Sequence, residues 1–232
     1  VETYLDSALT AEQVLEVGAD HVAVATGARW CASGVGRANH APVPVAEGAR
    51  VLTPDDIMDG AGAEGPVVIF DDDHYYMGGV LAEKLRAAGH EVTLVTPASV
   101  VSDWTVNTLE QGRIQTRLME MEVGIVPLHA LSAIGRESVT LECVYTERER
   151  EIPCATLVMV TMRRPEDALW RAVSEAAEAG PAPKSLLRIG DCLGPGTIAA
   201  AVYSGHRYAR ELGEPEADGV PFRRELPALA PD

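Results

Sequence analysis

Side chains that could do chemistry gather at two places where a predicted strand ends. The acidic and histidine run DDDH at 71–74 follows an apolar run at 66–70, and Asp191 follows Gly190 at the end of the run 186–191. Carboxylates and imidazoles can bind a metal ion or a ligand, and open α/β sheets bind ligands at the carboxyl ends of their strands. Consecutive residues that leave a strand point in opposite directions, however, so a solvated or capping cluster at 71–74 is favoured over a metal site.

Two further positions have small or helix-starting residues that suit a nucleotide. The run 21–25 is closed by Thr26 and Gly27, and Gly27 has no side chain to block a nucleotide, although an ordinary strand-to-loop turn is the simpler explanation of this pair alone. A helix is expected to begin near Thr197, where free N–H groups and the positive dipole end can face a phosphate or the edge of a flavin. Asp191 could equally cap that helix, and capping and ligand contact use the same geometry.

The bend after the run at 66–70 decides whether the middle of the chain can bind a dinucleotide. Such a site needs glycines at the first strand-to-helix turn, so that a pyrophosphate can touch the backbone and the helix N-terminus. Counting back from Gly89 places these positions at Asp73, Tyr75 and Gly78, and only the last is glycine. Tyr75 would fill the space of the pyrophosphate. At a separation of ~4 Å, each acidic side chain would repel it by about 1 kcal/mol in water, or by about 4 kcal/mol at an effective dielectric constant of about 20.

The residue after the next predicted strand leads to the same prediction. Thr96 stands where an acidic residue usually binds the ribose, and no arginine replaces it to hold a 2′-phosphate. The sequence therefore predicts that this segment keeps a dinucleotide-binding fold but does not bind NAD(P)H.

The remaining candidates have simpler structural explanations. His206 and Tyr208 could contact a ligand, but a helix surface or an interdomain contact is the commoner role. Trp104 and Trp170 could lie on an electron path but are more simply packing residues. The four cysteines contain no CxxC pair and predict neither a zinc site nor an iron–sulfur cluster, and we expect them to be reduced and partly buried; they are Cys31, Cys143, Cys154 and Cys192. No Ser–His–Asp or Cys–His arrangement indicates nucleophilic catalysis.

Hydrophobic periodicity predicts the elements that must position these residues. An apolar strand at 66–70, an amphipathic helix at 78–88 and a strand at 91–95 form the pattern of a βαβ crossover in a parallel sheet. Thr53 and Pro54 suit the N-cap and first position of a helix within 51–60. The other expected elements are a short helix or turn in 6–18, strands at 21–25, 155–161 and 186–191, helices at 107–122 and 197–212, short strands within 125–148, a surface connection at 31–50 and a proline-rich, loosely packed or contact-making tail at 214–232.

Length and composition limit the number of domains and the kinds of partner that the chain can have. The chain has 232 residues, enough for one large domain or two modest ones, and its formal net charge of −16 disfavours nucleic acid and anionic membranes. No run approaches the ~20 continuous apolar residues of a membrane span. The N-terminal sequence has neither a basic segment nor an apolar signal core, which favours the cytoplasm. Because the chain starts at Val1 and its first motif follows closely, we expect earlier sequence to precede it.

These segments, in their order, resemble those of flavoproteins that have two dinucleotide-binding domains. The order is VATG, an inserted βαβ unit with GHEVTLV, and a Gly-Asp strand followed by PGTIAAAVYSGHRYARE. More narrowly, the segments VLTPDDIMDG (51–60), DDDHYYMGGVLAEKLRAAGHEVTLVT (71–96) and the helix after IGDC (189–192) resemble the trimethylamine, dimethylamine and histamine dehydrogenases. The wider relatives of these enzymes are the 2,4-dienoyl-CoA reductases and the bacterial NADH:flavin oxidoreductases. The resemblance covers nearly the whole chain.

The resemblance implies an α/β, Rossmann-like fold of the FAD/NAD(P)-binding type, in which one dinucleotide-type domain is inserted in another. Residues 1–52 with 151–232 would form a partial ADP- or FAD-type domain that lacks its N-terminal βαβ unit, and 53–150 would form an inserted NAD(P)-type domain with a degenerate glycine motif. The positions that match the family's nucleotide site are Thr26, Gly27, Gly190 and Asp191, and Thr197 starts the neighbouring helix.

The resemblance also implies cofactors and partners outside this chain. In that family an N-terminal (β/α)8 barrel carries FMN and a four-iron (4Fe–4S) cluster, and this chain has neither a cluster motif nor enough residues for a barrel. The implied partners are that barrel and an electron-transferring flavoprotein-type acceptor, within a homo-oligomeric parent enzyme. ADP or FAD would occupy the partial site, NAD(P)H is not expected, and the chain alone would be non-catalytic.

Three functions remain open at this point. The first is a nucleotide-holding module of an amine dehydrogenase that contains FMN and an iron–sulfur cluster. The second is the electron-entry module of an NAD(P)H-dependent flavin oxidoreductase or 2,4-dienoyl-CoA reductase, and the acidic bend at 71–78 disfavours it. The third is a purely structural assembly domain that retains only the shape of its ancestor.

Overall fold

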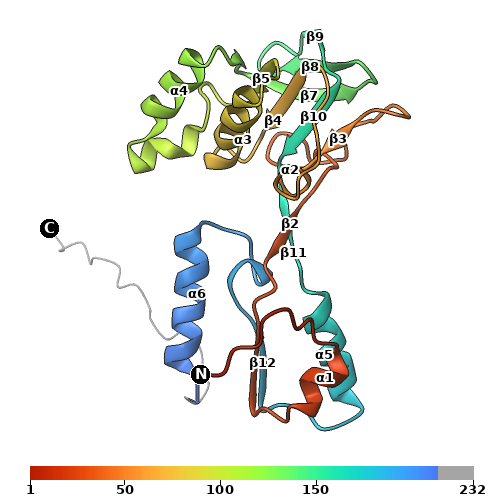
Figure 1. Ribbon diagram of the computed structural model, residues 1–232, viewed down its shortest axis with the longest axis vertical. Coiled ribbons are helices and arrows are strands. Elements are labelled where there is room, and N and C mark those ends of the chain that lie inside the picture. Colours follow the sequence, from red (N-terminus) through yellow and green to blue (C-terminus); the bar gives the residue numbers. More distant parts are fainter. Residues whose placement is uncertain (214–232) are drawn as a thin grey trace, which may run out of the picture. The chain divides into compact units, whose positions relative to one another are not determined.

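The computed structural model describes residues 1–213 and shows two compact units. One unit is formed by Val1–Ala25 with the described residues from Leu169 onward, and the other by Thr26–Ala168 (Figure 1). The second unit therefore interrupts the first in sequence. The expected proline-rich tail at 214–232 lies outside the described residues, and the expected boundaries at 52/53 and 150/151 stay a prediction.

The second unit is built on a five-stranded parallel sheet. Across the sheet the strands are β3 (Val51–Leu52), β10 (Thr156–Val160), β4 (Val67–Asp71), β5 (Val92–Val95) and β6 (Gly124–Val126). Every residue of β4 and β10 is buried, as expected of central strands covered on both faces. The strands expected at 66–70, 91–95 and 155–161 are confirmed within one residue at each end.

Two different layers cover the two faces of this sheet. On one face lie α3 (Tyr76–Ala87) and α4 (Gln111–Glu120), and on the other lies an antiparallel sheet of β7 (His129–Ile134), β8 (Ser138–Cys143) and β9 (Glu149–Pro153) (Figure 1). Val67 and Ile69 of β4 pack in the core with the helices, whereas Val68 and Phe70 pack in the core with the antiparallel layer. The period-two alternation of the strand thus fills two cores at once.

The helices of the second unit begin and end at residues with identifiable roles. In α2 (Pro54–Met58), Thr53 is the N-cap and Pro54 the first helical residue, as expected. The Oγ1 of Thr53 accepts the N–H of Asp56 at 3.3 Å, and the N–H of Thr53 donates to Asp56 Oδ2 at 2.7 Å, which is a capping box. α3 is followed by Gly89, whose φ of +93° suits glycine alone and ends the helix.

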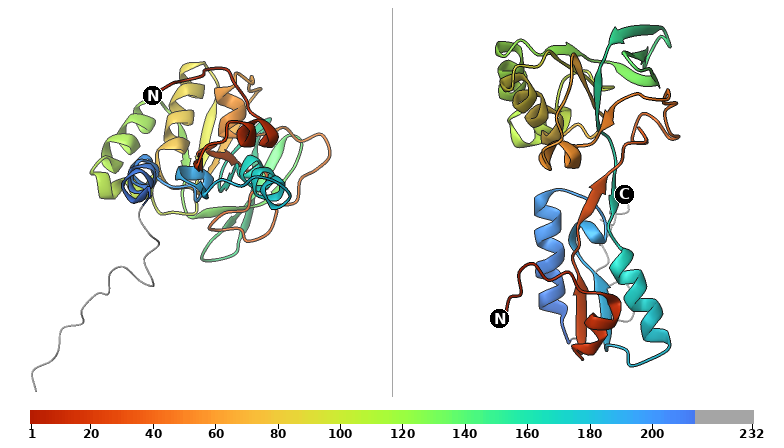
Figure 2. Two further views of the ribbon diagram at one scale, coloured as in Figure 1. Left: turned by 90° about the horizontal axis from the view of Figure 1, so that it is seen from below. Right: turned by 45° about the vertical axis from the view of Figure 1, so that its right-hand side comes forward.

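The first unit contains a parallel pair of strands, β1 (His21–Val24) and β12 (Ser185–Arg188). On one side of this pair lie α1 (Ala11–Glu16) and α5 (Ala168–Glu178), and on the other lies α6 (Ile198–Glu211), as both views show (Figures 1 and 2). None of the residues of α6 is buried within the described part of the chain. The strand expected at 186–191 ends earlier, and a short 3-10 helix, η2 (Gly190–Cys192), follows it.

Several expectations about local structure need correction. The segment 31–50, expected to be a surface connection, buries Gly34 and Val43, because it packs over the parallel sheet. It is preceded by a short strand, β2 (Ala28–Trp30), that pairs antiparallel with β11 (Arg163–Pro165). The helix expected at 107–122 starts later, because a 3-10 helix, η1 (Asp103–Thr108), precedes it.

Among residues 1–213, no helix combines the length and apolar character that crossing a membrane requires.

Candidate functional site

The carboxyl end of the parallel sheet is the place where this kind of fold binds ligands. From β4 the chain proceeds through β5 to β6 on one side, whereas β10 pairs with β4 on the other. The crevice between β4 and β10 is therefore the point at which the strand order reverses, and dinucleotides bind at such points in related folds. The DDDH run leaves β4 at this crevice.

The chain's own backbone bridges the crevice. The N–H of Asp72 donates to the carbonyl of Val160 at 2.8 Å, and the N–H of Asp73 donates to the same carbonyl at 3.1 Å. Val160 is the last residue of β10. The loop after β4 thus continues across the sheet instead of leaving the crevice open.

A segment from the long connection covers the bridged crevice, and we call residues 35–38 the strap. The N–H groups of Arg37 and Ala38 both donate to Asp72 Oδ2, the latter at 2.9 Å, and the carbonyl of Val35 accepts the N–H of Met162 at 3.3 Å. At Gly36 an added Cβ would lie 3.2 Å from Cγ of Asp72 and in contact with its Oδ2. Sequence reasoning missed the strap. The small residues at 33–38 were the signal that this segment packs closely.

Asp71, the last residue of β4, points its carboxyl group at the start of α3. Its side chain is fully buried, and its Oδ1 accepts the N–H of His74 at 3.0 Å. Its Oδ2 has no hydrogen-bond partner among residues 1–213. A Cβ added at Gly78, the third residue of α3, would lie 2.5 Å from Asp71 Cγ and 2.8 Å from Asp71 Cβ. The carboxyl group therefore packs against the first turn of α3.

Burial controls the ionisation of Asp71. Removal from water raises the pKa of this carboxyl from 3.8 to about 7, against the N–H and the positive charge of His74, which lower it. The negative charge of Asp73 raises it further. A carboxyl group with this pKa can hold a proton near neutral pH, but it faces the protein interior.

The DDDH run is a buried network and not a solvated cluster, which corrects part of the expectation. Asp72 and His74 are 1% and 8% exposed, and the Nε2 of His74 lies 3.3 Å from Asp72 Oδ1. The Nδ1 of His74 lies 3.3 Å from the hydroxyl of Thr96. His74 has a φ of +62°, which turns its N–H back to Asp71. Within the described residues, no three His, Cys, Asp or Glu side chains are placed to hold a metal ion.

The outer part of the bend carries arginine and aromatic side chains. Arg37 stacks over the ring of Trp104 at 5.2 Å, and the rings of Tyr75 and Tyr76 lie 4.2 Å apart. Burial raises the pKa of Asp73, although the charges of Arg163 and Arg37 oppose this shift. Of the three positions assigned to the glycine motif, Asp73 lies in the loop, Tyr75 precedes α3 as its N-cap, and Gly78 lies in its first turn.

In the first unit, the candidate nucleotide residues surround the start of α6. The carboxylate of Asp191 accepts the N–H of Gly196 at 3.1 Å, and Thr197, not Asp191, caps α6 by accepting the N–H of Ala200 at 3.3 Å. Gly190 has a φ of +60°, and its N–H donates to the hydroxyl of Ser204 at 2.9 Å. The helix start expected near Thr197 is confirmed, and the ligand role of these residues stays a prediction.

Thr26 and Gly27 belong to the second unit. The hydroxyl of Thr26 donates to the carbonyl of Glu166, and the carbonyl of Gly27 accepts the N–H of Glu166 at 2.9 Å. Gly27 has a φ of +81°, and an added Cβ there would meet nothing within 4 Å. The pair forms a glycine-dependent turn with open space beside it, and its part in nucleotide binding stays a prediction.

The other candidates lie outside the bend and the start of α6, except Trp104, which is 51% exposed and so is not the packing residue that was expected. Trp170 packs in the first unit, where its Nε1 donates to the carbonyl of Leu186 at 3.4 Å and its ring lies under Arg188 at 4.7 Å. His206 is exposed on α6 and Tyr208 is half-buried. None of the four cysteines forms a disulfide within residues 1–213, and Cys154 and Cys192 are buried.

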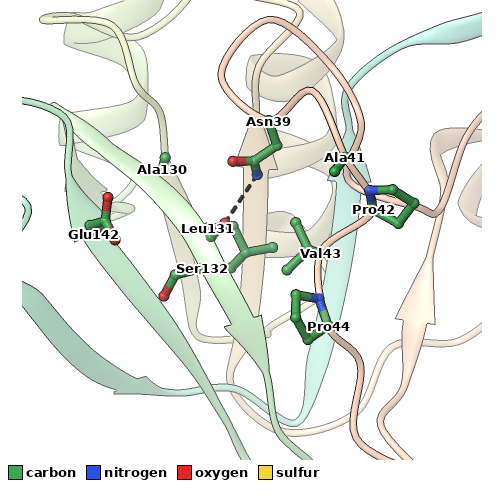
Figure 3. A pocket seen from close by; sticks show the side chains of 9 residues that line it. All are labelled: Asn39, Ala41, Pro42, Val43, Pro44, Ala130, Leu131, Ser132 and Glu142. Atoms are coloured by element: carbon green, nitrogen blue, oxygen red, sulfur yellow. Dashed lines mark hydrogen bonds between the residues drawn. The ribbon is translucent and has the colours of Figure 1, made fainter.

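A hollow of about 170 Å³ in the second unit lies apart from the bend (Figure 3). Asn39 and the chain that follows it form one wall, and β7 and β8 form the other. The side chain of Asn39 donates to the carbonyl of Leu131 at 3.0 Å across it. Its lining includes none of the residues at 71–78, so it offers no access to them.

Known proteins match regions in both units of this chain. Residues 52–153 match the family described as OYE-like second alpha/beta domain. Dimethylamine dehydrogenase from Hyphomicrobium sp. (strain x) is 32% identical over 94% of this chain and 33% of its own length. The chain thus spans about a third of that relative.

Solved structures also match most of this chain. Histamine dehydrogenase from Rhizobium sp. 4-9 matches with a TM-score of 0.93 and 46% identity over 99% of this chain and 36% of that chain. The 6-hydroxypseudooxynicotine amine oxidase from Pseudomonas geniculata N1 matches with a TM-score of 0.87 and 42% identity over 91% of this chain and 32% of that chain. A flavoprotein disulfide reductase from Escherichia coli, an engineered NADPH oxidase and a ferredoxin reductase from Rhodopseudomonas palustris share the α/β fold alone, at 14% to 21% identity and TM-scores of 0.51 to 0.58.

Proposed function

We propose that this chain, which is homologous to the C-terminal region of the dimethylamine and histamine dehydrogenase family, is the nucleotide-holding module of an amine dehydrogenase. The parent enzyme would oxidise an amine and pass the electrons to an electron-transferring flavoprotein-type acceptor. The module alone would be non-catalytic. Relatives named as amine dehydrogenases and an amine oxidase, each about three times as long as the matching region, support this proposal.

The redox groups of the parent enzyme would lie outside this chain. FMN and a 4Fe–4S cluster supply the oxidation and the one-electron transfer in the family that the sequence resembles. The cysteines of this chain do not fit a cluster, because they are far apart in sequence and no three metal-binding side chains come together in the described part. The barrel domain of the same enzyme is therefore the proposed site of both groups and the principal partner of this module.

The first unit would hold ADP or FAD. The residues that fit a nucleotide are Gly190, Asp191 and Thr197, since a glycine with positive φ, a carboxylate and a capped helix N-terminus come together after β12. A helix N-terminus favours a phosphate, and a carboxylate can bind a ribose hydroxyl. For Thr26 and Gly27, which belong to the second unit, the proposed nucleotide role rests on the sequence resemblance alone.

One observation carries the choice between amine dehydrogenase and NAD(P)H-dependent reductase. The Asp71 carboxyl group packs against Gly78 at the bend where a dinucleotide would place its phosphates. The strap and the two N–H bonds to Val160 close the same crevice. These contacts support a second unit that does not bind NAD(P)H, so that electrons would enter from the amine alone.

Anaerobic reduction of the complete enzyme tests this function. We expect dimethylamine or histamine to bleach the flavin absorbance of the enzyme that contains this chain, and NADH and NADPH to leave it oxidised. A photochemically reduced sample controls for a flavin that cannot be reduced at all. Rapid reduction by NADH or NADPH would instead identify the chain as the electron-entry module of a flavin oxidoreductase.

A structural assembly role is the second candidate, and one observation favours it. Ile198, Val202 and Tyr203 on α6 are 65% or more exposed, and a two-stranded sheet is marginal by itself. These features indicate that the first unit contacts further protein. Titration of the chain with ADP distinguishes the two roles. Saturable binding of ADP would support the nucleotide-holding role, whereas the assembly role requires no nucleotide.

A further inference from the structure

We propose that one face of the two-stranded ribbon of β2 and β11 binds an acidic surface in the rest of the parent enzyme, with Arg29 and Arg164 as the central contacts. The inference deepens the proposed function, because it names the surface through which this module meets its partner region. It rests on the proposal that this chain is one module of a larger enzyme. It does not depend on which amine that enzyme oxidises.

Two arginines lie directly opposite each other on this ribbon. β2 and β11 pair antiparallel, and Arg164 is the register partner of Arg29. Side chains in such a pair lie on the same face with their Cβ atoms about 5 Å apart, and like charges in this position repel each other. Both residues are exposed. We call the side of the ribbon that carries them the arginine face.

Neither arginine has an anionic partner in the described part of the chain. No hydrogen bond or ion pair joins Arg29 or Arg164 to another residue among 1–213, although the chain has 35 acidic residues and only 19 lysines and arginines. Arg86, in contrast, is paired with Glu122 at 3.0 Å. An acidic surface from outside this chain would relieve the repulsion, because guanidinium groups bind carboxylates through two parallel N–H bonds.

The rest of the arginine face has the composition of a protein interface. Two positions further along the ribbon, the carbonyl of Met162 accepts the N–H of Cys31 at 3.0 Å, and Met162 is 39% exposed. Side chains alternate between the two faces of a strand, so Met162 shares the face of Arg164, and Cys31 shares that of Arg29. Methionine and arginine are enriched in protein interfaces. These residue types favour a protein partner over a free anion.

The opposite face holds the ribbon in place. Trp30 packs against the core of the second unit, its backbone N–H donates to Asp55 Oδ2 at 2.9 Å, and the guanidinium group of Arg163 lies over its ring at 5.2 Å. The backbone that carries the two opposed arginines is therefore fixed from its other side. A group that is already positioned loses less freedom on binding, and arginine is among the residues that contribute most to protein interfaces.

The lengths of the relatives supply the partner. Histamine dehydrogenase and dimethylamine dehydrogenase match this chain over 36% and 33% of their own lengths, so each has further protein outside the matching region. We therefore assign the acidic surface to the remainder of the parent enzyme and not to a separate protein.

The thiol of Cys31 reports on the arginine face. Cys31 and Cys143 are partly exposed and form no disulfide within residues 1–213, so alkylation of each by iodoacetamide can be followed by mass spectrometry. We expect Cys31 to react at least about tenfold more slowly in the complete enzyme than in the 232-residue chain, which corresponds to about 1.4 kcal/mol. Cys143, which lies on β8, is the control and should react equally in both. Equal rates for Cys31 in the two proteins would overturn the inference.

Charge reversal tests whether the arginines make the contact. In the complete enzyme that carries both Arg29→Glu and Arg164→Glu, we expect Cys31 to react as fast as in the 232-residue chain with the same substitutions, because an acidic partner would be repelled. Arg113→Glu with Arg150→Glu is the matched control, since it makes the same change in charge at exposed arginines outside the ribbon. Circular dichroism checks the folding of each variant. Equal loss of protection in the two double variants would contradict a contact made by Arg29 and Arg164.

Pyrophosphate distinguishes a free anion from a protein surface. Added to the 232-residue chain at constant ionic strength, it should leave the alkylation rate of Cys31 unchanged. Protection by pyrophosphate would identify a phosphate site and overturn the assignment to a protein partner. Reduction of the flavin by dimethylamine or histamine, which tests the proposed function, is a separate measurement, so the two failures are distinguishable.

Discussion

Asp71→Asn is expected to make the second unit more stable than the unmodified protein at about pH 8 and equally stable at about pH 4. The reason is the burial of the Asp71 carboxyl group, which raises its pKa from 3.8 to about 7. An amide has nearly the same shape as a protonated carboxyl group but does not ionise. The difference in the free energy of unfolding at about pH 8 should reach at most about 4 kcal/mol.

The sign follows from the protons bound in each state. Between about pH 4 and about pH 7 the unfolded Asp71 is ionised, whereas the folded one keeps its proton. The folded state then binds more protons, so the contribution of Asp71 to stability is largest below pH 3.8, falls as the pH rises through this window and is lowest above about pH 7. Asp71→Asn removes this fall.

Urea unfolding from about pH 4 to about pH 8, with hydrogen exchange of the β4 amides, measures the effect. Asp59→Asn is the control, because Asp59 is an exposed aspartate of the same unit and its substitution makes the same change in net charge. A constant difference between Asp71→Asn and the unmodified protein across this range would contradict a buried carboxyl group that titrates near neutral pH.

Gly78→Ala is expected to destabilise the second unit by about 2 to 3 kcal/mol, although alanine favours helices. The added methyl group would lie 2.5 Å from Cγ and 2.8 Å from Cβ of Asp71. The Cβ atom cannot move away without moving β4, because the strand is buried and paired on both sides. Urea unfolding measures this change.

A double-mutant cycle assigns the cause. With Asp71→Gly in the background, Gly78→Ala should cost less than about 1 kcal/mol, because both the carboxyl group and the Cβ that overlap the added methyl group are gone. Gly112→Ala in α4 is the matched control: an added Cβ there meets nothing within 4 Å, so we expect no loss of stability or a gain of about 0.5 kcal/mol. Additive effects of the two substitutions at Asp71 and Gly78 would rule out the contact between them.

The local parts of the fold were predictable because their causes lie in neighbouring residues. The strand–helix–strand unit from β4 to β5 follows from two apolar runs and from Leu81 and Leu85 on one helix face, and both leucines are buried. Gly89 ends the helix, and Thr53 caps α2, as their residue types indicate. The fold class followed from these patterns together with the resemblance to flavoproteins, and the comparisons confirm it.

The residue types at the bend after β4 were predictable from the sequence, but their positions were not. The sequence indicates acidic and bulky residues where glycines belong, but it does not show which of them faces the helix. The structure places Asp71 against Gly78, whereas Tyr75 precedes the helix and its ring contacts that of Tyr76 at a tilt of 56°. This arrangement depends on the positive φ of His74, and the residue types around His74 do not predict a positive φ there.

The strap could not be predicted because its contacts are distant in sequence. Arg37 and Ala38 bind a carboxylate about 35 residues away, and a glycine- and proline-rich segment without periodicity gives no sign of such a partner. The candidate nucleotide residues are similar. Their helix start at Thr197 is local and was predicted, while the bond from Gly196 to Asp191 becomes evident only when the loop is folded.

Titration of the 232-residue chain with NADH and NADPH, followed by cofactor fluorescence, tests the central claim most directly. Because the Asp71 carboxyl group packs against the first turn of α3 and the strap covers the loop that follows β4, we predict no saturable change in fluorescence up to millimolar cofactor. Saturable binding with a dissociation constant in the micromolar range, weakened by Gly78→Ala, would show that a dinucleotide does seat at this bend and would contradict the account.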